Sequence, residues 1–171
     1  MHELKIPEQR VACLIGTRGV TKRLIEQKTH TRLLVSKEGE IVLEGEHVDT
    51  YLSSLICKAI GRGFNPSIAL LLLNEAYGLE LLTISEFTGK QKKKQERIKA
   101  RLIGTEGKAR MHLERLTGCH IVVFGKTVGI IGSFDFLDIA RRGIEKLLGG
   151  APHGNVYRYL EIELKKRETS S

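Results

Sequence analysis

Aromatic side chains are few in this 171-residue sequence, which has no tryptophan, four tyrosines and five phenylalanines. None clusters beside a glycine-rich turn, which excludes the base-stacking platform of an RRM-type domain. Long hydrophobic runs are also missing, because the longest, residues 68–73, is far too short to cross a bilayer. No basic-then-apolar signal segment opens the chain. These absences predict a cytoplasmic protein with no membrane partner.

Cysteine is scarce as well. Cys13, Cys57 and Cys119 contain no C-x-x-C pair, and three thiols cannot all pair within one chain. This usage fits a reducing compartment. The six histidines are scattered, and none joins a cysteine pair at the spacing of metal ligands. We therefore expect neither a metal nor a cofactor.

Motifs of the common enzyme classes are absent. Gly125-Lys126-Thr127 resembles the end of a P-loop, but the glycine required five residues earlier is replaced by His120. No Gly-x-Ser-x-Gly sequence is present. The sequence predicts a binding protein rather than an enzyme.

Charge is distributed unevenly along the chain, whose formal net charge is +8. Residues 1–89 contain 10 Lys or Arg and 11 Asp or Glu, whereas residues 90–171 contain 18 and 9. The first part therefore carries a net charge of −1 and the second +9. A basic balance favours an anionic partner, and a nucleic acid would be attracted mainly by the second part.

An internal repeat organises the chain. Aligning residues 11–35 with residues 99–123, a shift of 88, gives eight identical positions. In both copies two short aliphatic runs of strand type follow, separated by a turn at glycine. The identical positions are Ala12, Leu14, Ile15, Gly16, Thr17, Gly19, Glu26 and Thr29, with their counterparts 88 residues later.

An amphipathic helix is expected after the last strand of each copy. The spacing of its apolar residues places one apolar stripe on each helix. The stripes consist of Val48, Leu52, Leu55, Ile56 and Ala59 in the first copy, and Leu137, Ala140, Ile144, Leu147 and Leu148 in the second.

The repeat predicts an α+β fold of two tandem domains, each a three-stranded sheet packed on three helices. Leading strands are expected at residues 3–6 and 81–87. Asn65 and Pro66 favour a helix start, and this helix should run through the leucines to Gly78. The expected parts are a first domain at 1–63, an interdomain helix at 64–79, a second domain at 80–150 and a C-terminal extension at 151–171.

Each copy contains a Gly-x-x-Gly turn between two helices, Gly16-Thr17-Arg18-Gly19 and Gly104-Thr105-Glu106-Gly107. Glycine permits backbone angles that other residues avoid and lets a sugar-phosphate backbone approach the main chain. The following helix N-terminus attracts phosphate. A single turn of this kind is a weak signal, but its duplication in matching surroundings is a strong one.

Leu14-Ile15-Gly16-Thr17-Arg18-Gly19 and its second copy resemble the motifs of type I KH domains. Three further stretches are similar to the partner-of-Nob KH proteins of archaea, which are assembly factors of the small ribosomal subunit. This resemblance implies binding to small-subunit ribosomal RNA near its 3′ end, and a partnership with the endonuclease that trims that end. The three stretches are Ala59-Ile60-Gly61-Arg62-Gly63-Phe64, Ile131-Gly132-Ser133-Phe134 and Leu147-Leu148-Gly149-Gly150-Ala151-Pro152.

The candidate RNA-binding residues surround the two turns. Glu106 places an acid in the second turn where the first has Arg18, which weakens the local attraction for phosphate. A run of basic residues before the turn offsets this loss: Lys90, Lys92, Lys93, Lys94 and Arg97. The apolar side chains of Met111 and Ile121, and the strand-start residues Arg32 and His120, would contact bases. The candidates are Gly16, Thr17, Arg18, Gly19, Lys22 and Arg32 in the first copy, and Lys99, Arg101, Gly104, Thr105, Glu106, Gly107, Lys108, Arg110, Met111, His120 and Ile121 in the second.

The sequence therefore predicts a monomeric protein that binds single-stranded RNA during ribosome assembly. The alternative is a KH-fold adaptor that binds assembly or translation proteins, which the charge-poor first domain favours. A steep salt dependence of RNA binding would distinguish the first function from the second.

Overall fold

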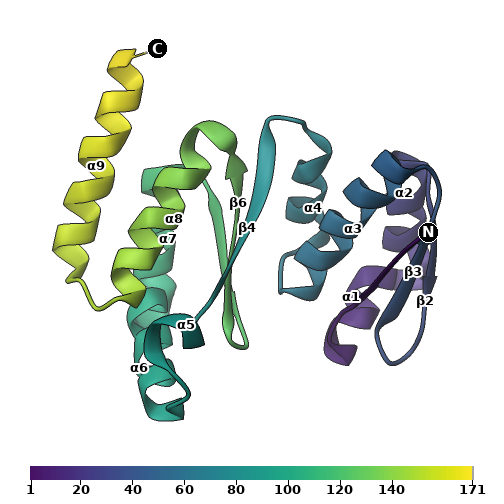
Figure 1. Ribbon diagram of the computed structural model, residues 1–171, viewed down its shortest axis with the longest axis horizontal. Coiled ribbons are helices and arrows are strands. Elements are labelled where there is room, and N and C mark those ends of the chain that lie inside the picture. The colour runs from purple at the N-terminus through teal and green to yellow at the C-terminus, as the bar shows by residue number, and fades with distance from the viewer. Residues whose placement is uncertain (171) are drawn as a thin grey trace. The chain divides into compact units, whose positions relative to one another are not determined.

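The computed structural model describes residues 1–170 and contains two compact units. The first spans Met1–Leu79, and the second begins at Glu80, so the boundary falls within the first strand of the second sheet, β4 (Tyr77–Thr83). Each unit contains one three-stranded antiparallel sheet with its helices on one face (Figure 1).

The first unit follows the predicted order of elements. Its sheet has the order β1-β3-β2, and the register pairs Leu4 with Ile41 and Leu33 with Leu43. The elements are β1 (His2–Lys5), η1 (Glu8–Arg10), α1 (Val11–Ile15), η2 (Thr17–Gly19), α2 (Val20–Thr29), β2 (Arg32–Val35), β3 (Glu40–Glu44), α3 (His47–Gly61), α4 (Pro66–Ala69) and η3 (Leu70–Leu73).

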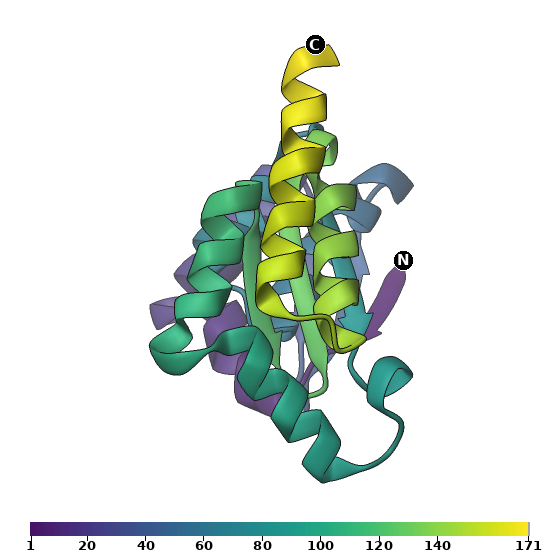
Figure 2. The ribbon, with the colours of Figure 1, turned by 90° about the vertical axis from the view of Figure 1, so that its left-hand side faces the viewer.

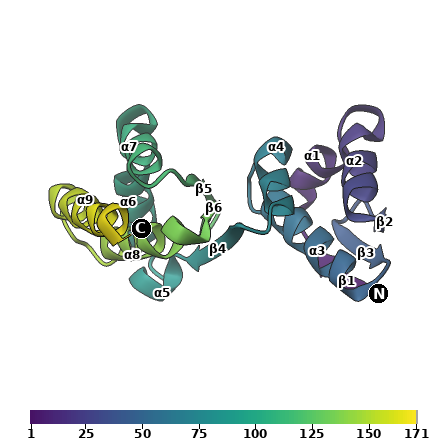
Figure 3. The same cartoon turned by 90° about the horizontal axis from the view of Figure 1, so that it is seen from above.

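The second unit repeats this arrangement, with the sheet order β4-β6-β5, and adds a short helix after its first strand and a long one at its end (Figure 3). The elements are β4 (Tyr77–Thr83), α5 (Ser85–Thr88), α6 (Lys92–Ile103), η4 (Thr105–Gly107), α7 (Lys108–Thr117), β5 (His120–Phe124), β6 (Thr127–Ser133), α8 (Phe134–Leu148) and α9 (His153–Ser170).

The core of the second unit lies between its sheet and its helices. All five residues of the predicted stripe on α8 are buried, which confirms that this stripe faces the core. Helix α9 forms an outer layer on α7 and α8 (Figure 2). Val156 and Leu160 of α9 are fully buried, and a Cβ atom on Gly143 of α8 would lie 2.8 Å from Leu160 Cδ2. The predicted C-terminal extension is therefore packed on the second unit.

The predicted stripe on α3 is only partly correct. Ile56 and Ala59 are buried, but Val48 is exposed, and Leu52 and Leu55 are half-buried. The inward face contains short polar side chains instead, with Ser53 and Ser54 among them.

Hydrogen bonds explain why polar residues can face inward on α3. Ser54 Oγ donates to the Tyr51 carbonyl at 2.6 Å, and Thr31 Oγ1 donates to Ser53 Oγ at 3.2 Å. At the end of α3, Gly61 packs closely on the residue that follows β1, since a Cβ atom on Gly61 would lie 2.5 Å from Ile6 Cγ2.

Residues 64–79 differ from the helix expected there. Asn65 caps the start as predicted, because its Oδ1 accepts the Ser67 N–H at 2.9 Å. However, the α-helix ends at Ala69, the leucines form the 3-10 helix η3, and Gly78 already lies in β4. Both short helices contact α3, so residues 66–73 complete the first unit. The second leading strand consequently lies four residues earlier than predicted.

None of the helices in residues 1–170 is long and apolar enough to span a membrane.

Candidate nucleic-acid interface

The two Gly-x-x-Gly turns have nearly the same backbone conformation. Gly16 and Gly104 both have φ of 75°, with ψ of 172° and 174°. Gly19 and Gly107 also have φ of 75°, with ψ of 17° and 11°. The repeat seen in the sequence therefore extends to the geometry of the turn, although the third residue of the turn differs between the copies.

That third residue is in the left-handed region in both turns. Arg18 has φ of 55° and Glu106 has φ of 56°. Such a conformation costs of order 1–3 kcal/mol for a residue with a side chain, and it persists where the surroundings enforce it. Both side chains are exposed, so the turn presents them to solvent at the start of a helix.

The two glycines of each turn have different roles. A Cβ atom on Gly16 would lie 2.3 Å from Thr21 Oγ1, and one on Gly104 would lie 2.7 Å from Ala109 Cβ. The first glycine is therefore required for close packing against the following helix. By contrast, the nearest atom to a Cβ on Gly107 would be Arg110 Nη2 at 3.9 Å. Gly107 therefore leaves open space through which a sugar-phosphate backbone can approach.

Helices α2 and α7 start directly after these turns. No side chain caps either N-terminus by a hydrogen bond. The first N–H groups of a helix and its dipole both attract an anion. Each turn thus leads into a local attraction for phosphate, which the second turn combines with open space at Gly107.

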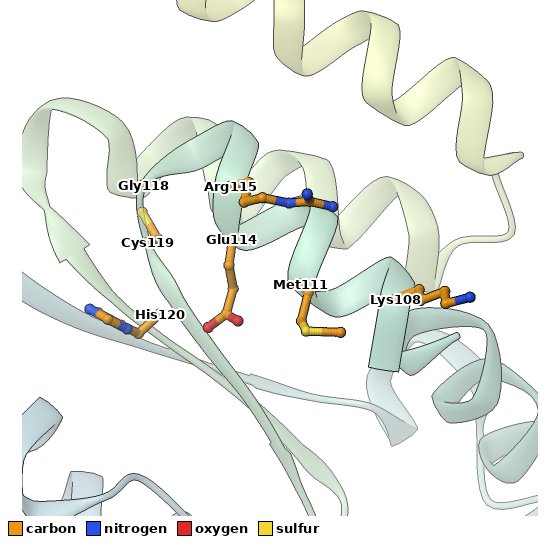
Figure 4. Close-up of a pocket in the computed structure, with 7 residues that line it drawn as sticks. All are labelled: Lys108, Met111, Glu114, Arg115, Gly118, Cys119 and His120. Carbon is orange, nitrogen blue, oxygen red and sulfur yellow. The ribbon is translucent and has the colours of Figure 1, made fainter. Parts of the chain in front are cut away.

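A groove of about 520 Å³ lies between α7 and β5 (Figure 4). Met111 and Glu114 project from α7 toward it, and His120 lies at its β5 side (Figure 4). Met111 is 42% exposed, so the groove offers an apolar surface to a base. The lining residues are Lys108, Met111, Glu114, Arg115, Gly118, Cys119 and His120.

Glu114 connects α7 to the outer edge of β5. Its Oε2 accepts the Ile121 N–H at 2.8 Å, and its Oε1 accepts Arg110 Nη1 at 2.6 Å. Arg110 also donates to the Ile121 carbonyl at 3.2 Å. The backbone at this position of the groove is therefore bonded to two charged side chains of α7.

The first unit contains the same connection. Glu26 Oε2 accepts the Leu33 N–H at 3.0 Å, and Lys22 Nζ lies 3.5 Å from Glu26 Oε1. Glu26 and Glu114 are identical in the repeat, yet neither is among the residues predicted to form the site. Their identity was the available signal, because an acid kept in both copies among changing neighbours indicates a specific bond.

The predicted site residues fall into three groups. The exposed ones beside the turns or the groove are Thr17, Arg18, Arg32, Thr105, Glu106, Lys108 and Met111. The half-buried ones are Gly16, Gly19, Lys22, Lys99, Gly104, Gly107, Arg110 and His120. The remaining two are Arg101, which is half-buried and whose Nη2 donates to the Ala151 carbonyl at 2.7 Å, and Ile121, whose side chain is 3% exposed in the core.

The basic run before the second turn lies at the start of α6 and just ahead of it. Gln95 turns inward, and its Nε2 donates to the Gly89 carbonyl at 2.9 Å. The basic side chains remain at the surface, where they form a positive approach to the turn. The exposed members are Lys90, Lys92, Lys93, Lys94 and Arg97.

The two buried thiols are not suited to nucleophilic chemistry. Burial raises the pKa of Cys57 to about 12 and that of Cys119 to about 11, so both stay protonated near neutral pH. Within residues 1–170, no three His, Cys, Asp or Glu side chains gather as metal ligands would.

Comparison with known families identifies both units. The eukaryotic type KH domain (KH domain type I) matches residues 78–165, and the KH domain matches residues 1–49. The chain belongs to the KH-domain family. The predicted fold, two tandem type I KH domains with three-stranded sheets, is thereby confirmed.

The relatives narrow the family to the PNO1/Dim2 type. A KH domain-containing protein of Methanocaldococcus jannaschii is 39% identical over 168 residues, which cover 95% of this chain and 74% of the relative. The pre-rRNA-processing protein PNO1 of Kluyveromyces lactis is 33% identical over 115 residues. That match covers 64% of this chain but 42% of PNO1, so the KH protein described here is similar to less than half of that relative.

A solved structure is similar over nearly the whole chain. A chain in the crystal structure of the a/eIF2alpha–aDim2p–rRNA complex from Pyrococcus horikoshii is 38% identical, with a TM-score of 0.88. The similarity covers 96% of this chain and 94% of that chain. This KH protein is therefore of the archaeal PNO1/Dim2 type, as its resemblance to the partner-of-Nob proteins implied.

Proposed function

We propose that this KH protein binds single-stranded RNA of the small ribosomal subunit near its 3′ end during ribosome assembly. The main supporting observation is the Gly-x-x-Gly turn, which occurs twice with one backbone geometry in front of two uncapped helix N-termini. KH domains use such a turn to clamp a short stretch of RNA backbone. The names of the relatives support ribosomal RNA as the ligand, because one is a pre-rRNA-processing protein and another forms a complex with rRNA.

In this proposal the turns hold the sugar-phosphate backbone and the groove holds bases. Lys108 and the exposed basic residues of α6 attract the strand, while Met111 and His120 contact bases in the groove. Arg32, at the strand-start position equivalent to that of His120, has the same role in the first domain. Arg18 of the first turn approaches phosphate directly, whereas Glu106 makes the second turn depend on its basic neighbours.

The proposed role is binding without catalysis, by a monomer in the cytoplasm. The endonuclease that trims the 3′ end would be a protein partner of the RNA-bound form. A KH-fold adaptor for assembly or translation proteins is the alternative, and the low net charge of the first domain favours it for that half of the chain.

Titration of the full chain with a fluorescent single-stranded RNA of the small-subunit 3′ end, and with a shuffled RNA of equal length, tests the proposal. With four to six phosphate contacts, log affinity should fall with log salt at a slope of roughly −3 to −4. The natural sequence should bind more tightly than the shuffled one at every salt concentration. A flat salt response would favour the adaptor, and equal affinity for both RNAs would refute the proposed 3′-end target.

A further inference from the structure

Helices α3 and α8 are equivalent elements of the two domains. Both contain 15 residues and follow a glycine at the end of a strand. Their C-terminal hydrogen bonds also agree at a shift of 87 residues. Gly63 N–H donates to the Ile60 carbonyl as Gly150 N–H donates to Leu147, at 3.1 Å and 3.0 Å. The chain therefore leaves both helices in the same direction.

The segment that follows is much shorter in the first domain. Helix α9 has 18 residues, whereas α4 and η3 have four each. Their first turns correspond, because Ala69 and Val156, which match at the shift of 87, are both fully buried. The last ten residues of α9 have no counterpart in the first domain.

Those additional residues cover the first turns of α8. Arg167 of α9 donates to the Asp138 carboxylate at 2.9 Å and also to the Asp135 carbonyl. Asp135 and Asp138 correspond to Val48 and Tyr51 of α3 at the same shift. In the first domain the equivalent surface has no covering helix.

Apolar side chains occupy this uncovered surface. Val48 is 76% exposed and Tyr51 is 59% exposed, while Leu52 and Leu55 are half-buried. These four residues, here called the α3 stripe, recur at the spacing of one helix face. Since the inward face of α3 is formed by other residues, Val48 and Tyr51 of the α3 stripe are not needed for the core.

Acidic side chains lie at the N-terminal end of the α3 stripe. Glu46 is exposed, Asp49 is half-buried, and Glu44 lies next to them along the chain. Arg32 Nη1 lies 3.9 Å from Glu44 Oε2 at this end of the stripe. A partner with positive charge at this end would complement the surface, as Arg167 complements Asp138 in the second domain.

We propose that the α3 stripe binds an amphipathic helix of another protein. The helix lies antiparallel to α3, in the place that the end of α9 takes on α8. Its apolar side chains cover Val48, Tyr51 and Leu55, and a basic residue pairs with Glu46 or Asp49. Many proteins recognise a peptide in this way: an amphipathic helix lays its apolar face, formed by residues at i, i+3, i+4 and i+7, on an apolar surface of the protein.

A second copy of the chain is a less suitable occupant. Stable dimers bury about 800 Å² on each partner, and four side chains, two of them already half-buried, present much less. A single docked helix needs only such a narrow stripe. The proposal is independent of RNA binding, because neither Gly-x-x-Gly turn contributes to this surface.

The probe is a synthetic amphipathic peptide of about 15 residues, long enough to form a helix on binding, with leucines on one face and arginines beside them. Addition to the isotope-labelled full chain should shift the amide NMR signals of Val48, Tyr51 and Leu55. The Val48→Asp, Tyr51→Asp double variant should bind the peptide at least roughly tenfold more weakly, about 1.4 kcal/mol. Both positions are exposed, and Asp is the residue of the second domain there, so the fold should persist.

Phe134→Asp is the matched control, because Phe134 is 59% exposed at the first position of α8. It should leave peptide affinity unchanged, as should Gly107→Asp in the RNA-binding turn. A second peptide with glutamates in place of the arginines should bind more weakly. Shifts confined to the groove at Met111, or equal affinities of the double variant and the native chain, would overturn the proposal.

Two further measurements separate the other occupants. A soluble gadolinium chelate should broaden the Tyr51 ring signals of the free full chain, because the α3 stripe is open. Protection of Tyr51 would show that another part of the same chain covers it and would overturn the proposal. Sedimentation would overturn the proposal in favour of a second copy if the native chain were a dimer and the Val48→Asp, Tyr51→Asp double variant a monomer.

Discussion

Arg101 donates a hydrogen bond from its guanidinium to the carbonyl oxygen of Ala151 at 2.7 Å. His153 Nε2 lies 2.7 Å from the carbonyl oxygen of Arg101. These two contacts join the start of α9 to the end of α6, three residues before Gly104. Arg10 does the same for the first domain, since its Nη2 donates to the Phe64 carbonyl at 2.9 Å. A guanidinium thus fixes the exit from the last shared helix in both domains.

Arg101→Ala should therefore lower stability as well as RNA affinity. Loss of a hydrogen bond from a charged donor costs about 1.5–3 kcal/mol, and the change should appear as a lower midpoint of urea unfolding. Lys90→Ala, at an exposed position of the basic run, should reduce RNA affinity with no change in the midpoint. Equal midpoints for Arg101→Ala and the native chain would show that the Ala151 contact contributes nothing.

Gly107→Asp should weaken RNA binding at least roughly tenfold while the second domain stays folded. Asp tolerates the left-handed conformation better than most residues, and a side chain at this position meets open space. Gly107→Asn has nearly the same shape without the charge, so it should weaken binding less. Circular dichroism would verify folding of both variants, and equal affinities for Asn and Asp would argue against a phosphate at this glycine.

The second domain should contribute more to RNA affinity than the first. Gly19→Asp places the same carboxylate in the equivalent turn, where the nearest atom to the new Cβ is Arg23 Nη1 at 3.2 Å. Because the basic residues are concentrated after position 89, Gly19→Asp should cost less affinity than Gly107→Asp in the full chain. A larger loss for Gly19→Asp would reverse the assignment.

Gly104→Ala should unfold more easily than Gly107→Ala. At Gly104 the new Cβ would lie 2.7 Å from Ala109 Cβ, and its φ of 75° with ψ of 174° is accessible essentially to glycine alone. Strain and overpacking together predict a loss of about 2–4 kcal/mol. Gly107→Ala should lose only the free energy needed to hold alanine in the left-handed backbone conformation, about 1 kcal/mol. Denaturation followed through amide NMR signals of the second domain would measure both, and similar losses would contradict the different roles of the two glycines.

Stability should decline as pH rises above about 9, partly because of two thiols. Burial raises the folded-state pKa of Cys57 from 9.0 to about 12, and that of Cys119 from 9.0 to about 11. Below pH 9 both thiols are protonated in the folded and unfolded states, so their contribution is constant. Above it only the unfolded state loses the protons, and the folded state is progressively destabilised.

Alanine variants isolate this effect from the titration of lysine and tyrosine. The Cys57→Ala, Cys119→Ala double variant should lose less stability between pH 9 and 11 than the native chain does. Cys13→Ala, at a half-buried position, is the control for a general effect of cysteine removal. Parallel pH profiles for the native chain and the double variant would exclude the thiols as the cause.

The order of elements and the two turns could be predicted from the sequence because they depend on local chemistry. Gly16 and Gly104 are both required by contacts within a few residues, and the repeat made each of them visible twice. The stripe on α8 could be predicted because that helix is covered by its sheet and by α9, and all five residues of the stripe are buried.

The stripe on α3 could not be assigned in the same way, because hydrophobic spacing does not tell which face meets the sheet. Ser53 and Ser54 face inward since their hydroxyls form hydrogen bonds there. The helix predicted from Pro66 to Gly78 was also too long, because α4 ends at Ala69. The Asn74 side chain accepts the Ala76 N–H at 2.9 Å, which forms a turn and sends the chain into β4 at Tyr77. Propensity favoured helix through the leucines, but the strand pairing of β4 prevailed.

The bonds of Glu26 and Glu114 also affect how the protein behaves at high concentration. Strands β2 and β5 are the last strands of their sheets, and a free strand edge is a template for pairing with other chains. Each carboxylate occupies one outward N–H of such a strand, at Leu33 or Ile121. The negative charge also opposes the approach of another backbone. The two glutamates therefore oppose edge-to-edge aggregation. A chain with alanine at both positions should form β-rich aggregates at concentrations at which the native protein stays in solution.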